Sequence, residues 1–330
     1  MGDILKGRVA IVTGSGQGIG RALAMAFAAE GAKVVTNNRK KGSTGSQMIT
    51  DEEYERLSDE KKKWYLEHIN DVNGDAETTA QAIRLAGGEA SAFFADISKF
   101  DQAEALVEFA VKTYGKIDIV ANIAGSFGFS DIDKISEELW DRVTSVKPKG
   151  YFNVMRFAIP YMKKQHYGRI INCSSRAFMG DVIKHAEYCA ANAGVVGLTR
   201  AAAIELWEYG ITCNAFSPFA RTRAAYELEA VNMTRDTNIM IGSAKAPSTE
   251  ITPLPELMTP FLTYLASEAS AEISGSMFSL AGNSISLHAE PVVCRNMFKA
   301  GSEPWTFDEI AKSAPRSIFA GYRSIAKPED

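Results

Sequence analysis

Short apolar runs alternate with amphipathic segments along most of the chain. The first run, at residues 8–13, is rich in β-branched side chains and predicts a buried parallel strand. A glycine-rich turn follows, then an Ala-rich helical segment at 21–30 and a second strand at 32–36. This order of strand, turn, helix and strand is a βαβ unit.

The alternation resumes after residue 74. We expect helices at 75–85, 101–114, 137–146 (continuing beyond 150) and 186–209, and strands at 91–95, 117–121, 169–172, 212–217 and 277–280. Strands that alternate with helices over about 270 residues predict an α/β fold. The predicted architecture is a single doubly wound parallel sheet, a Rossmann fold, with helices on both faces.

Two segments interrupt this pattern. Residues 39–74 form a charged insertion, in which we interpret the stretch 51–68 as a solvated helix in preference to a binding segment. Residues 286–330 carry scattered prolines with little periodicity and predict an ordered extension packed on the same domain. The expected organisation is therefore one domain at 1–285, with the insertion inside it, followed by the extension.

Composition narrows the class of protein. Of 330 residues, 46% are hydrophobic and 23% charged, which allows a large core and excludes wholesale disorder. The net charge of −4 gives no general attraction to nucleic acid or anionic membranes, and acidic residues interrupt the lysine runs of the insertion. We expect no nucleic-acid partner and no membrane association. The four cysteines lack zinc-site spacing, so we expect no metal and a reduced, cytoplasmic protein.

A glycine pattern occupies the first strand-to-helix turn, Thr13-Gly14-Ser15-Gly16-Gln17-Gly18-Ile19-Gly20. Glycine lets the backbone approach a pyrophosphate, whose charge the helix N-terminus favours. The alternative is a generic glycine-rich turn, but the position on the first βα unit of such a sheet indicates a dinucleotide site. The predicted cofactor contacts in this turn are Gly14, Ser15, Gln17, Gly18, Ile19 and Gly20.

The end of the second strand normally reads the adenosine ribose, through an acid for a 2′-hydroxyl or an arginine for a 2′-phosphate. Here the chain reads Asn37-Asn38-Arg39-Lys40-Lys41, without an acid. Arginine binds phosphate through paired hydrogen bonds, so Asn38 and Arg39 favour NADP over NAD. The alternative is that the cations only solvate the start of the insertion.

Further motifs show that residues 6–285 resemble the short-chain dehydrogenase/reductase family. Asp96-Ile97 looks like the family's adenine-contacting pair, and Asn122-Ile123-Ala124-Gly125 is similar to its Asn-Asn-Ala-Gly motif. Ser175 ends a strand segment like that of the family's catalytic serine, and Tyr188 follows at the family's spacing of 13 residues. The resemblance implies cofactor contacts from these positions: Asp96, Ile97, Asn122, Ala124, Gly125, Pro218 and Thr222.

The family's chemistry needs a tyrosine as acid/base, a lysine four residues later, a serine and an asparagine. A nearby cation is required because the ordinary pKa of tyrosine, about 10, is too high for work at neutral pH. In this chain the lysine position holds Asn192, while the asparagine position, 41 residues before Tyr188, holds Lys147. Because the two side chains face each other in the family, we hypothesise an exchanged tetrad of Ser175, Tyr188, Lys147 and Asn192.

The resemblance thus implies an oxidoreductase that moves a hydride between NADP(H) and a secondary alcohol or ketone, with Tyr188 as acid/base. The insertion, the Pro218–Arg223 segment and the tail resemble members that handle acyl-CoA, terpenoid or steroid alcohols. Residues 224–255 look like a substrate lid. Relatives are commonly homodimers or homotetramers. The alternative is a catalytically silent homologue that acts as a cofactor-binding or scaffold subunit, in which Lys147 points to solvent.

Overall fold

A computed structural model of the protein describes residues 2–42, 51–180, 184–234, 240–241, 244–245 and 249–322. Parts of the predicted insertion (43–50), lid (235–239, 242–243 and 246–248) and tail (323–330) lie outside the described residues. The chain divides into two compact units, residues 1–287 and 288–330.

The first unit is built on an eight-stranded sheet in the order β10-β9-β6-β5-β4-β1-β2-β3. The strands are β1 Val9–Thr13, β2 Lys33–Asn38, β3 Glu89–Phe94, β4 Ile119–Asn122, β5 Gly168–Cys173, β6 Ile211–Phe219, β9 Met277–Ala281 and β10 Ser284–Leu287. All neighbours pair in parallel except β10, which runs antiparallel to β9. The predicted doubly wound parallel sheet is confirmed, with this antiparallel edge strand added. A separate hairpin joins β7 Met240–Ile241 to β8 Ala244–Lys245.

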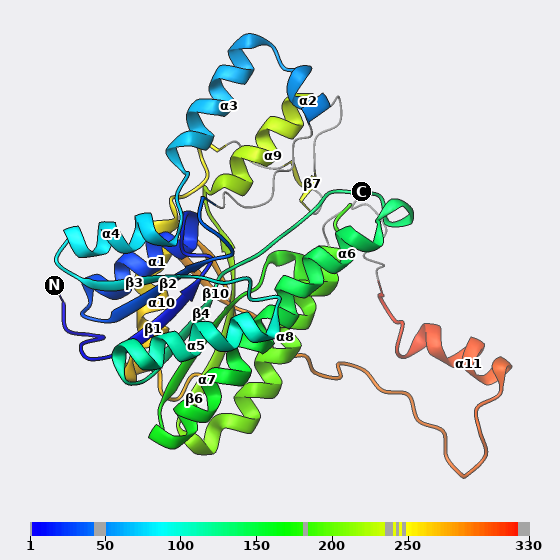
Figure 1. Ribbon diagram of the computed structural model, residues 1–330. Helices are drawn as coiled ribbons and strands as arrows, with labels where there is room; N and C mark the ends of the chain where they lie inside the picture. The colour runs from blue at the N-terminus through cyan, green and yellow to red at the C-terminus, as the bar shows by residue number, and fades with distance from the viewer. Residues whose placement is uncertain are drawn as a thin grey trace. The chain divides into compact units, whose positions relative to one another are not determined.

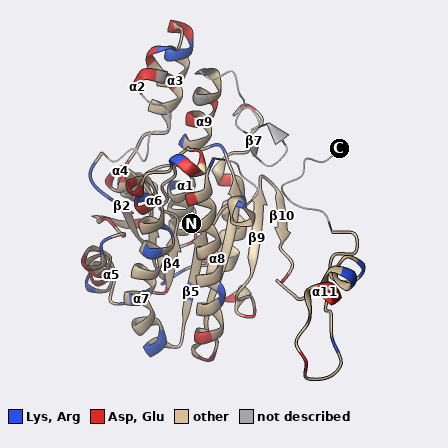
Figure 2. Cartoon of the chain, turned by 90° about the vertical axis from the view of Figure 1, so that its right-hand side faces the viewer, with Lys and Arg blue, Asp and Glu red and all other residues tan. Residues whose placement is uncertain are grey.

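Helices cover both faces of the sheet (Figure 1). One face carries α1 Gly18–Ala29, α4 Ala76–Leu85 and α10 Thr259–Ala266, packed on Ala10 and Val12 of β1. The other carries α5 Phe100–Tyr114, α7 Tyr151–Gln165 and α8 Ala186–Leu206, packed on Val9 and Ile11. Alternate side chains of β1 thus enter two different cores, which explains its continuous apolar run. Figure 2 shows most charged residues on the helices and few on the strands.

The helix expected to run through residue 150 is broken. Helix α6 is Glu137–Thr144, and the segment Ser145–Gly150 separates it from α7. Within that segment Lys147 has extended angles, φ −125° and ψ 127°, and Pro148 follows it. Pro148 disfavours helical angles at the residue before it, so the helix opens at Lys147.

The charged stretch of the insertion is helical, as predicted, but it forms two helices. Helix α2 is Asp51–Glu55 and α3 is Asp59–Asp71, whose N-terminus is capped by Ser58. One face of α3 is buried against α9 Arg223–Thr234, so the expectation of a fully solvated helix is wrong. The polar composition of α3 reflects its outer face, while only a few apolar residues fill the inner one.

The second unit contains one helix, α11 Phe307–Ser313, among its described residues. Thr306 and Glu309 form a capping box at its start, and Lys299 pairs with Glu309 at 2.7 Å. The division between the two units falls after residue 287, two residues beyond the predicted boundary at 285. The packing of the tail on the main domain stays a prediction.

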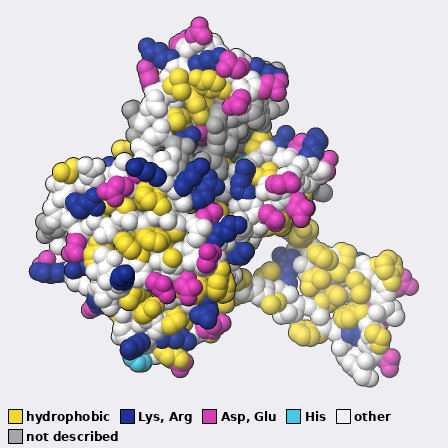
Figure 3. All heavy atoms as spheres, in the orientation of Figure 1, with side chains coloured by type: hydrophobic (Ala, Val, Ile, Leu, Met, Phe, Trp, Pro, Cys, Tyr) yellow, Lys and Arg dark blue, Asp and Glu magenta, His cyan; other side chains and the backbone are white. Residues whose placement is uncertain are grey.

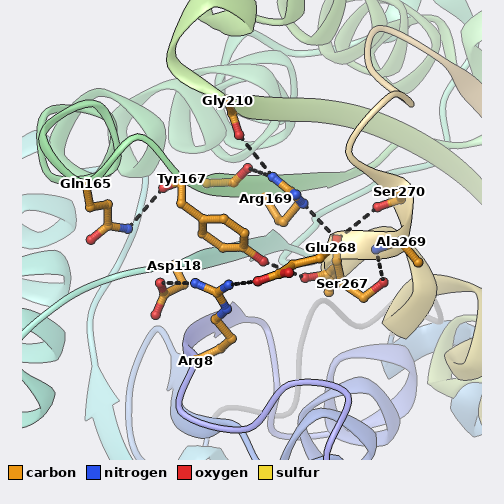
Figure 4. Close-up of polar contacts among 12 residues, drawn as sticks. Arg8, Asp118, Gln165, Tyr167, Arg169, Gly210, Ser267, Glu268, Ala269 and Ser270 are labelled. Carbon is orange, nitrogen blue, oxygen red and sulfur yellow. Dashed lines mark hydrogen bonds and ion pairs between the residues drawn. The ribbon is translucent and has the colours of Figure 1, made fainter.

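Arg169 closes the amino-terminal edge of the sheet (Figure 4). Its guanidinium is buried and donates to the carbonyls of Ser267, Gly168 and Gly210 at 2.9, 2.9 and 3.1 Å. Tyr167 lies between Arg169 and Arg8, whose guanidinium carbons are 4.4 and 3.6 Å from the ring centre. This network ties three chain segments to the start of β5.

Candidate active site

The predicted site residues gather at the opposite, carboxyl-terminal edge. Strands β1, β4 and β5 are adjacent and parallel, so their ends at Thr13, Asn122 and Cys173 lie together. The strand order reverses beside β1, where chains leave the sheet toward opposite faces. Such a switch point opens a crevice that binds ligands in open α/β sheets.

The glycine turn fits tightly between neighbouring loops. Gly14 and Gly18 have φ of 64° and 52°, in the left-handed region. A Cβ on Gly14 would lie 2.7 Å from the Ala124 Cα, and one on Gly16 would lie 2.3 Å from the Asn38 Oδ1. Glycine is therefore required for the turn to reach the loops after β2 and β4.

The remaining turn residues shape the start of α1. Ser15 is buried, and its Oγ accepts from the Asn37 amide at 2.8 Å, so this hydroxyl is occupied within the protein. Gln17 is the N-cap of α1, and the first turn of the helix carries no acid. Ile19 packs against the core beneath, and a Cβ on Gly20 would strike the Gly14 carbonyl. The helix N-terminus is thus electrostatically suited to an anion.

The loops after β3 and β4 present further predicted contacts. Asp96 is half-buried, and its Oδ1 accepts from the Ser98 amide and hydroxyl at 3.0 and 2.7 Å. The carbonyl of Ile97 accepts from Asn153 at 2.8 Å. Asn122 donates to Asn172 at 3.0 Å, whereas its buried Oδ1 has no partner among the described residues.

The Ala124 amide is held by the Thr13 hydroxyl at 3.2 Å. Gly125, predicted as a cofactor contact, lies against the Lys147 side chain, because a Cβ there would be 3.2 Å from Lys147 Cε. Pro218 belongs to β6 and pairs with Leu280. Thr222 lies beside Gly18, where a Cβ would come within 3.3 Å of its methyl group.

The ribose end of the site contains an acid that the sequence at 37–41 does not show. Asp75, at the far end of the insertion, returns beside this strand end and accepts from the Gly42 amide at 3.0 Å. Backbone hydrogen bonds from Gly42 and Thr78 and the charge of Lys41 lower its pKa, against the effect of burial. Asp75 caps α4, and this helix-start pattern is the only sequence feature that marks it.

These features fit a dinucleotide. The glycine turn has no room for side chains, and the first turn of α1 carries no acid. Asn38 and Asn122 each have a buried side-chain oxygen with no partner in the described part of the chain. Both orphan oxygens are acceptors, which suits hydroxyl or amide donors of a bound ligand. Arg39 lies exposed next to Asn38.

Lys147 and Asn192 meet in the core of the site. Lys147 is 2% exposed, so it does not point to solvent, and its ammonium donates to the Cys173 carbonyl at 2.6 Å and to Asn192 Oδ1 at 3.4 Å. Asn192 in turn donates to the Tyr188 carbonyl, one helical turn earlier, at 2.8 Å. The third N–H of the ammonium has no partner among the residues described.

Tyr188 lies close to that ammonium. Lys147 Nζ is 5.9 Å from the centre of the Tyr188 ring, and Tyr188 is half-buried in the first turn of α8. Ser175 follows β5 and starts the turn Arg176–Met179, which packs on α8; its Oγ accepts from the Ala177 amide at 3.3 Å. The structure thus brings Lys147, Asn192 and Tyr188 together and places Ser175 on the adjoining turn.

Comparison with known proteins identifies the fold's relatives. Residues 8–55 and 55–229 match the family described as short chain dehydrogenase. The chain belongs to the short-chain dehydrogenase family. It is similar to the hydroxyacyl-CoA dehydrogenase ChsB1 of Mycobacterium tuberculosis, at 32% identity over 96% of this chain and 90% of that protein. A crystal structure of a short chain dehydrogenase from Mycobacterium avium superposes with a TM-score of 0.74, at 31% identity over 99% of this chain and 98% of that one.

A peroxisomal multifunctional enzyme type 2 of Drosophila melanogaster is 33% identical over 86% of this chain. The chain spans only 40% of that relative's length. Family membership implies an NAD(P) cofactor. Within the described ranges, no helix has the length and apolar character to cross a membrane.

Three buried side chains around the short-chain dehydrogenase site escaped prediction. Tyr151 is fully buried; its hydroxyl lies 2.9 Å from the Ala124 carbonyl and 3.1 Å from the Cys173 carbonyl, and Lys147 Nζ is 5.6 Å from its ring centre. Burial raises the pKa of Tyr151 well above its usual value. Nothing in the sequence around Tyr151 distinguishes it from an ordinary helix residue.

The other two, His185 and Glu187, lie beside Tyr188 at the start of α8. Burial lowers the pKa of His185 to about 4, and burial raises the pKa of Glu187. The His185 ring packs edge-on against Phe129 at 5.1 Å and lies 6.1 Å from the Tyr188 ring. Phe127 also lies edge-on to Tyr188 at 6.1 Å, so the surroundings of this tyrosine are aromatic.

Proposed function

We propose that this short-chain dehydrogenase is an active NADP(H)-dependent oxidoreductase of secondary alcohols and ketones, with its lysine moved from α8 to the segment between α6 and α7. The observation that supports it is the buried Lys147 ammonium beside both Asn192 and Tyr188. An uncompensated buried cation costs several kcal/mol, and such a cost is typical of functional sites.

Tyr188 would exchange the proton with the substrate oxygen. Lys147 places a positive charge beside the phenol, where negative charge would develop as the proton leaves. Cys173 and Asn192 hold the ammonium from two sides, so that its remaining N–H is available to the Tyr188 oxygen or a ribose hydroxyl. Ser175 would donate a hydrogen bond to the substrate oxygen, where charge develops. When bound, the nicotinamide supplies or accepts the hydride.

Asn192 would take the place that the family gives to lysine. Its amide is fixed by the Tyr188 carbonyl and by Lys147, which leaves it in one orientation. In this arrangement Asn192 is a positioning residue that keeps the ammonium directed toward Tyr188.

The preference for NADP rests on Arg39, Lys40 and Lys41, which lie exposed at the end of β2. A 2′-phosphate gains charge-assisted hydrogen bonds from such cations. Asp75 works against this preference, but its oxygens already accept from Gly42 and Thr78. The orphan Asn38 Oδ1 suits a ribose hydroxyl, which either cofactor offers.

The substrate would be an alcohol on a large apolar skeleton, such as a 3-hydroxyacyl-CoA or a steroid. The aromatic rings of Phe127, Phe129 and His185 near Tyr188 favour apolar atoms there, and Phe219 is 39% exposed where β6 ends. Two similar proteins carry hydroxyacyl-CoA dehydrogenase and peroxisomal multifunctional enzyme in their names.

The predicted homodimer or homotetramer stays a prediction. The predicted compartment remains the cytosol, although the multifunctional relatives are named peroxisomal.

Lys147→Met tests the proposal, since methionine keeps the volume and removes the charge. We expect turnover of a 3-hydroxyacyl-CoA to fall about 10³-fold, while NADPH binding by fluorescence stays within a few-fold. Unchanged turnover in Lys147→Met would refute the role of Lys147. NADPH binding by the wild type, without turnover of any acyl-CoA, steroid or terpenoid alcohol, would favour the silent scaffold subunit.

A further inference from the structure

The insertion and the predicted lid share an apolar cluster that is separate from the two cores of the sheet. In Figure 1, α2, α3 and α9 lie together beyond the carboxyl edge of the sheet. Figure 3 shows hydrophobic side chains among the charged side chains of this part of the molecule. The buried members of the cluster are Leu57, Tyr65, Ile69, Tyr226 and Ala230. Trp64 and His68 of α3 also pack on the Tyr226 ring, at 6.1 and 5.0 Å between ring centres.

A polar network lies inside this cluster. Glu227 is fully buried, and its Oε1 accepts from the Tyr65 hydroxyl at 2.9 Å and from Arg223 Nε and Nη2 at 3.2 and 3.1 Å. Burial and the Glu227 carboxylate raise the pKa of Tyr65, so the phenol stays a donor at all ordinary pH values. We call Tyr65, Arg223 and Glu227 the α3–α9 brace. Exposed charge pairs are worth little, but a buried, shared carboxylate fixes its partners in one geometry.

The brace is connected to the cofactor side of the site. Arg223 Nη1 also donates to Asn73 Oδ1 at 3.0 Å, at the end of the insertion. The next residue, Gly74, lies so close to the glycine turn that a Cβ would be 2.5 Å from the Gly16 carbonyl. Arg223 itself follows Thr222, which lies beside Gly18.

The cluster is also connected to the substrate side. Phe129 packs against it and, edge-on, against His185, three residues before Tyr188. A displacement of α9 would therefore disturb Phe129 and, through His185, the aromatic surroundings of Tyr188.

We propose that the α3–α9 brace positions α9 as a wall of the substrate site, so that the insertion selects alcohols on long or polycyclic apolar skeletons over small ones. This inference rests on the proposed function. Tyr65, Arg223 and Glu227 are positioning residues: they touch neither the reacting atoms nor Lys147, and they act through α9 and Phe129.

Tyr65→Phe in the full-length protein tests the brace, since it removes one hydroxyl and keeps the ring. A lost hydrogen bond to a buried carboxylate predicts a KM about tenfold higher for a long-chain 3-hydroxyacyl-CoA. We expect kcat to stay within twofold, and the KM of a small secondary alcohol to stay unchanged. Hydrogen exchange of the α9 amides should become faster. Lys63→Ala, which changes an exposed residue of the same helix, is the matched control and should change none of these quantities.

A lower kcat at constant KM, equal KM changes for large and small alcohols, or unaltered α9 exchange would overturn the proposal. Absence of turnover in the wild type would instead refute the proposed oxidoreductase activity. In that event α9 exchange in Tyr65→Phe still decides whether the brace holds this helix.

Discussion

Strand β5 has a buried cation at each of its ends, and the two are held in different ways. Arg169, 3% exposed at the amino end, has the carboxylates Asp118 and Glu268 in its network through Arg8. Lys147, 2% exposed at the carboxyl end, has neutral oxygens and two tyrosine rings, and forms no ion pair among the described residues. Arg169 joins chain segments through carbonyls, and nearby carboxylates balance its charge, so we interpret it as structural. Lys147 has no such carboxylate and lies beside a phenol, which suits a role in catalysis.

Replacing each cation by methionine separates these roles. Arg169→Met removes the three hydrogen bonds that the guanidinium donates to backbone carbonyls, and we expect the free energy of unfolding to fall by about 4 kcal/mol. Turnover per folded molecule should persist. Lys147→Met should show the reverse, with stability unchanged or higher. Urea denaturation measures both; equal losses of stability would break the distinction between the two edges. Arg169→Lys, which keeps the charge and loses the planar fork, should fall between wild type and Arg169→Met.

His185, near the carboxyl end of β5, should make the stability of the protein depend on pH. Because its pKa is about 4 in the folded protein and near 6.5 when unfolded, the unfolded chain binds the extra proton first as pH falls. The protonation of His185 should therefore lower the free energy of unfolding by roughly 3 kcal/mol as the pH falls from 6.5 to 4. His185→Gln should lose that share of the acid dependence in denaturation curves taken across this range. His166→Asn, at an exposed position, is the control; the same pH dependence in His185→Gln and wild type would exclude His185 as the cause.

The smallest expected effect concerns Arg39, which follows β2 at the proposed ribose end of the site. Arg39→Ala should weaken NADPH binding about tenfold, or about 1.4 kcal/mol, because the proposed contact with the 2′-phosphate would be lost. NADH binding should be unaffected. Lys40→Ala serves as a neighbouring control with a smaller loss expected. If the wild type binds NADH more tightly than NADPH, the preference for NADP is contradicted. Arg39 would then only contact solvent at the start of the insertion.

The sequence by itself determined the seven parallel strands, the glycine turn and the family, because periodicity and short motifs are local properties of the chain. It also suggested that Lys147 and Asn192 are exchanged, but only through the positions of a related family. Their contact, and that of Cys173 with Lys147, depends on how the strands and helices pack.

Three features were decided by tertiary structure alone. Asp75 returns an acid to the end of β2 across the whole insertion, Tyr151 lies under Lys147, and Tyr65 reaches Glu227 across 162 residues. No local pattern encodes these contacts, because each joins segments whose separation in sequence says nothing of their distance in space. The charged insertion looked solvated for the same reason: the apolar partner that buries one face of α3 lies on α9, in a distant part of the sequence.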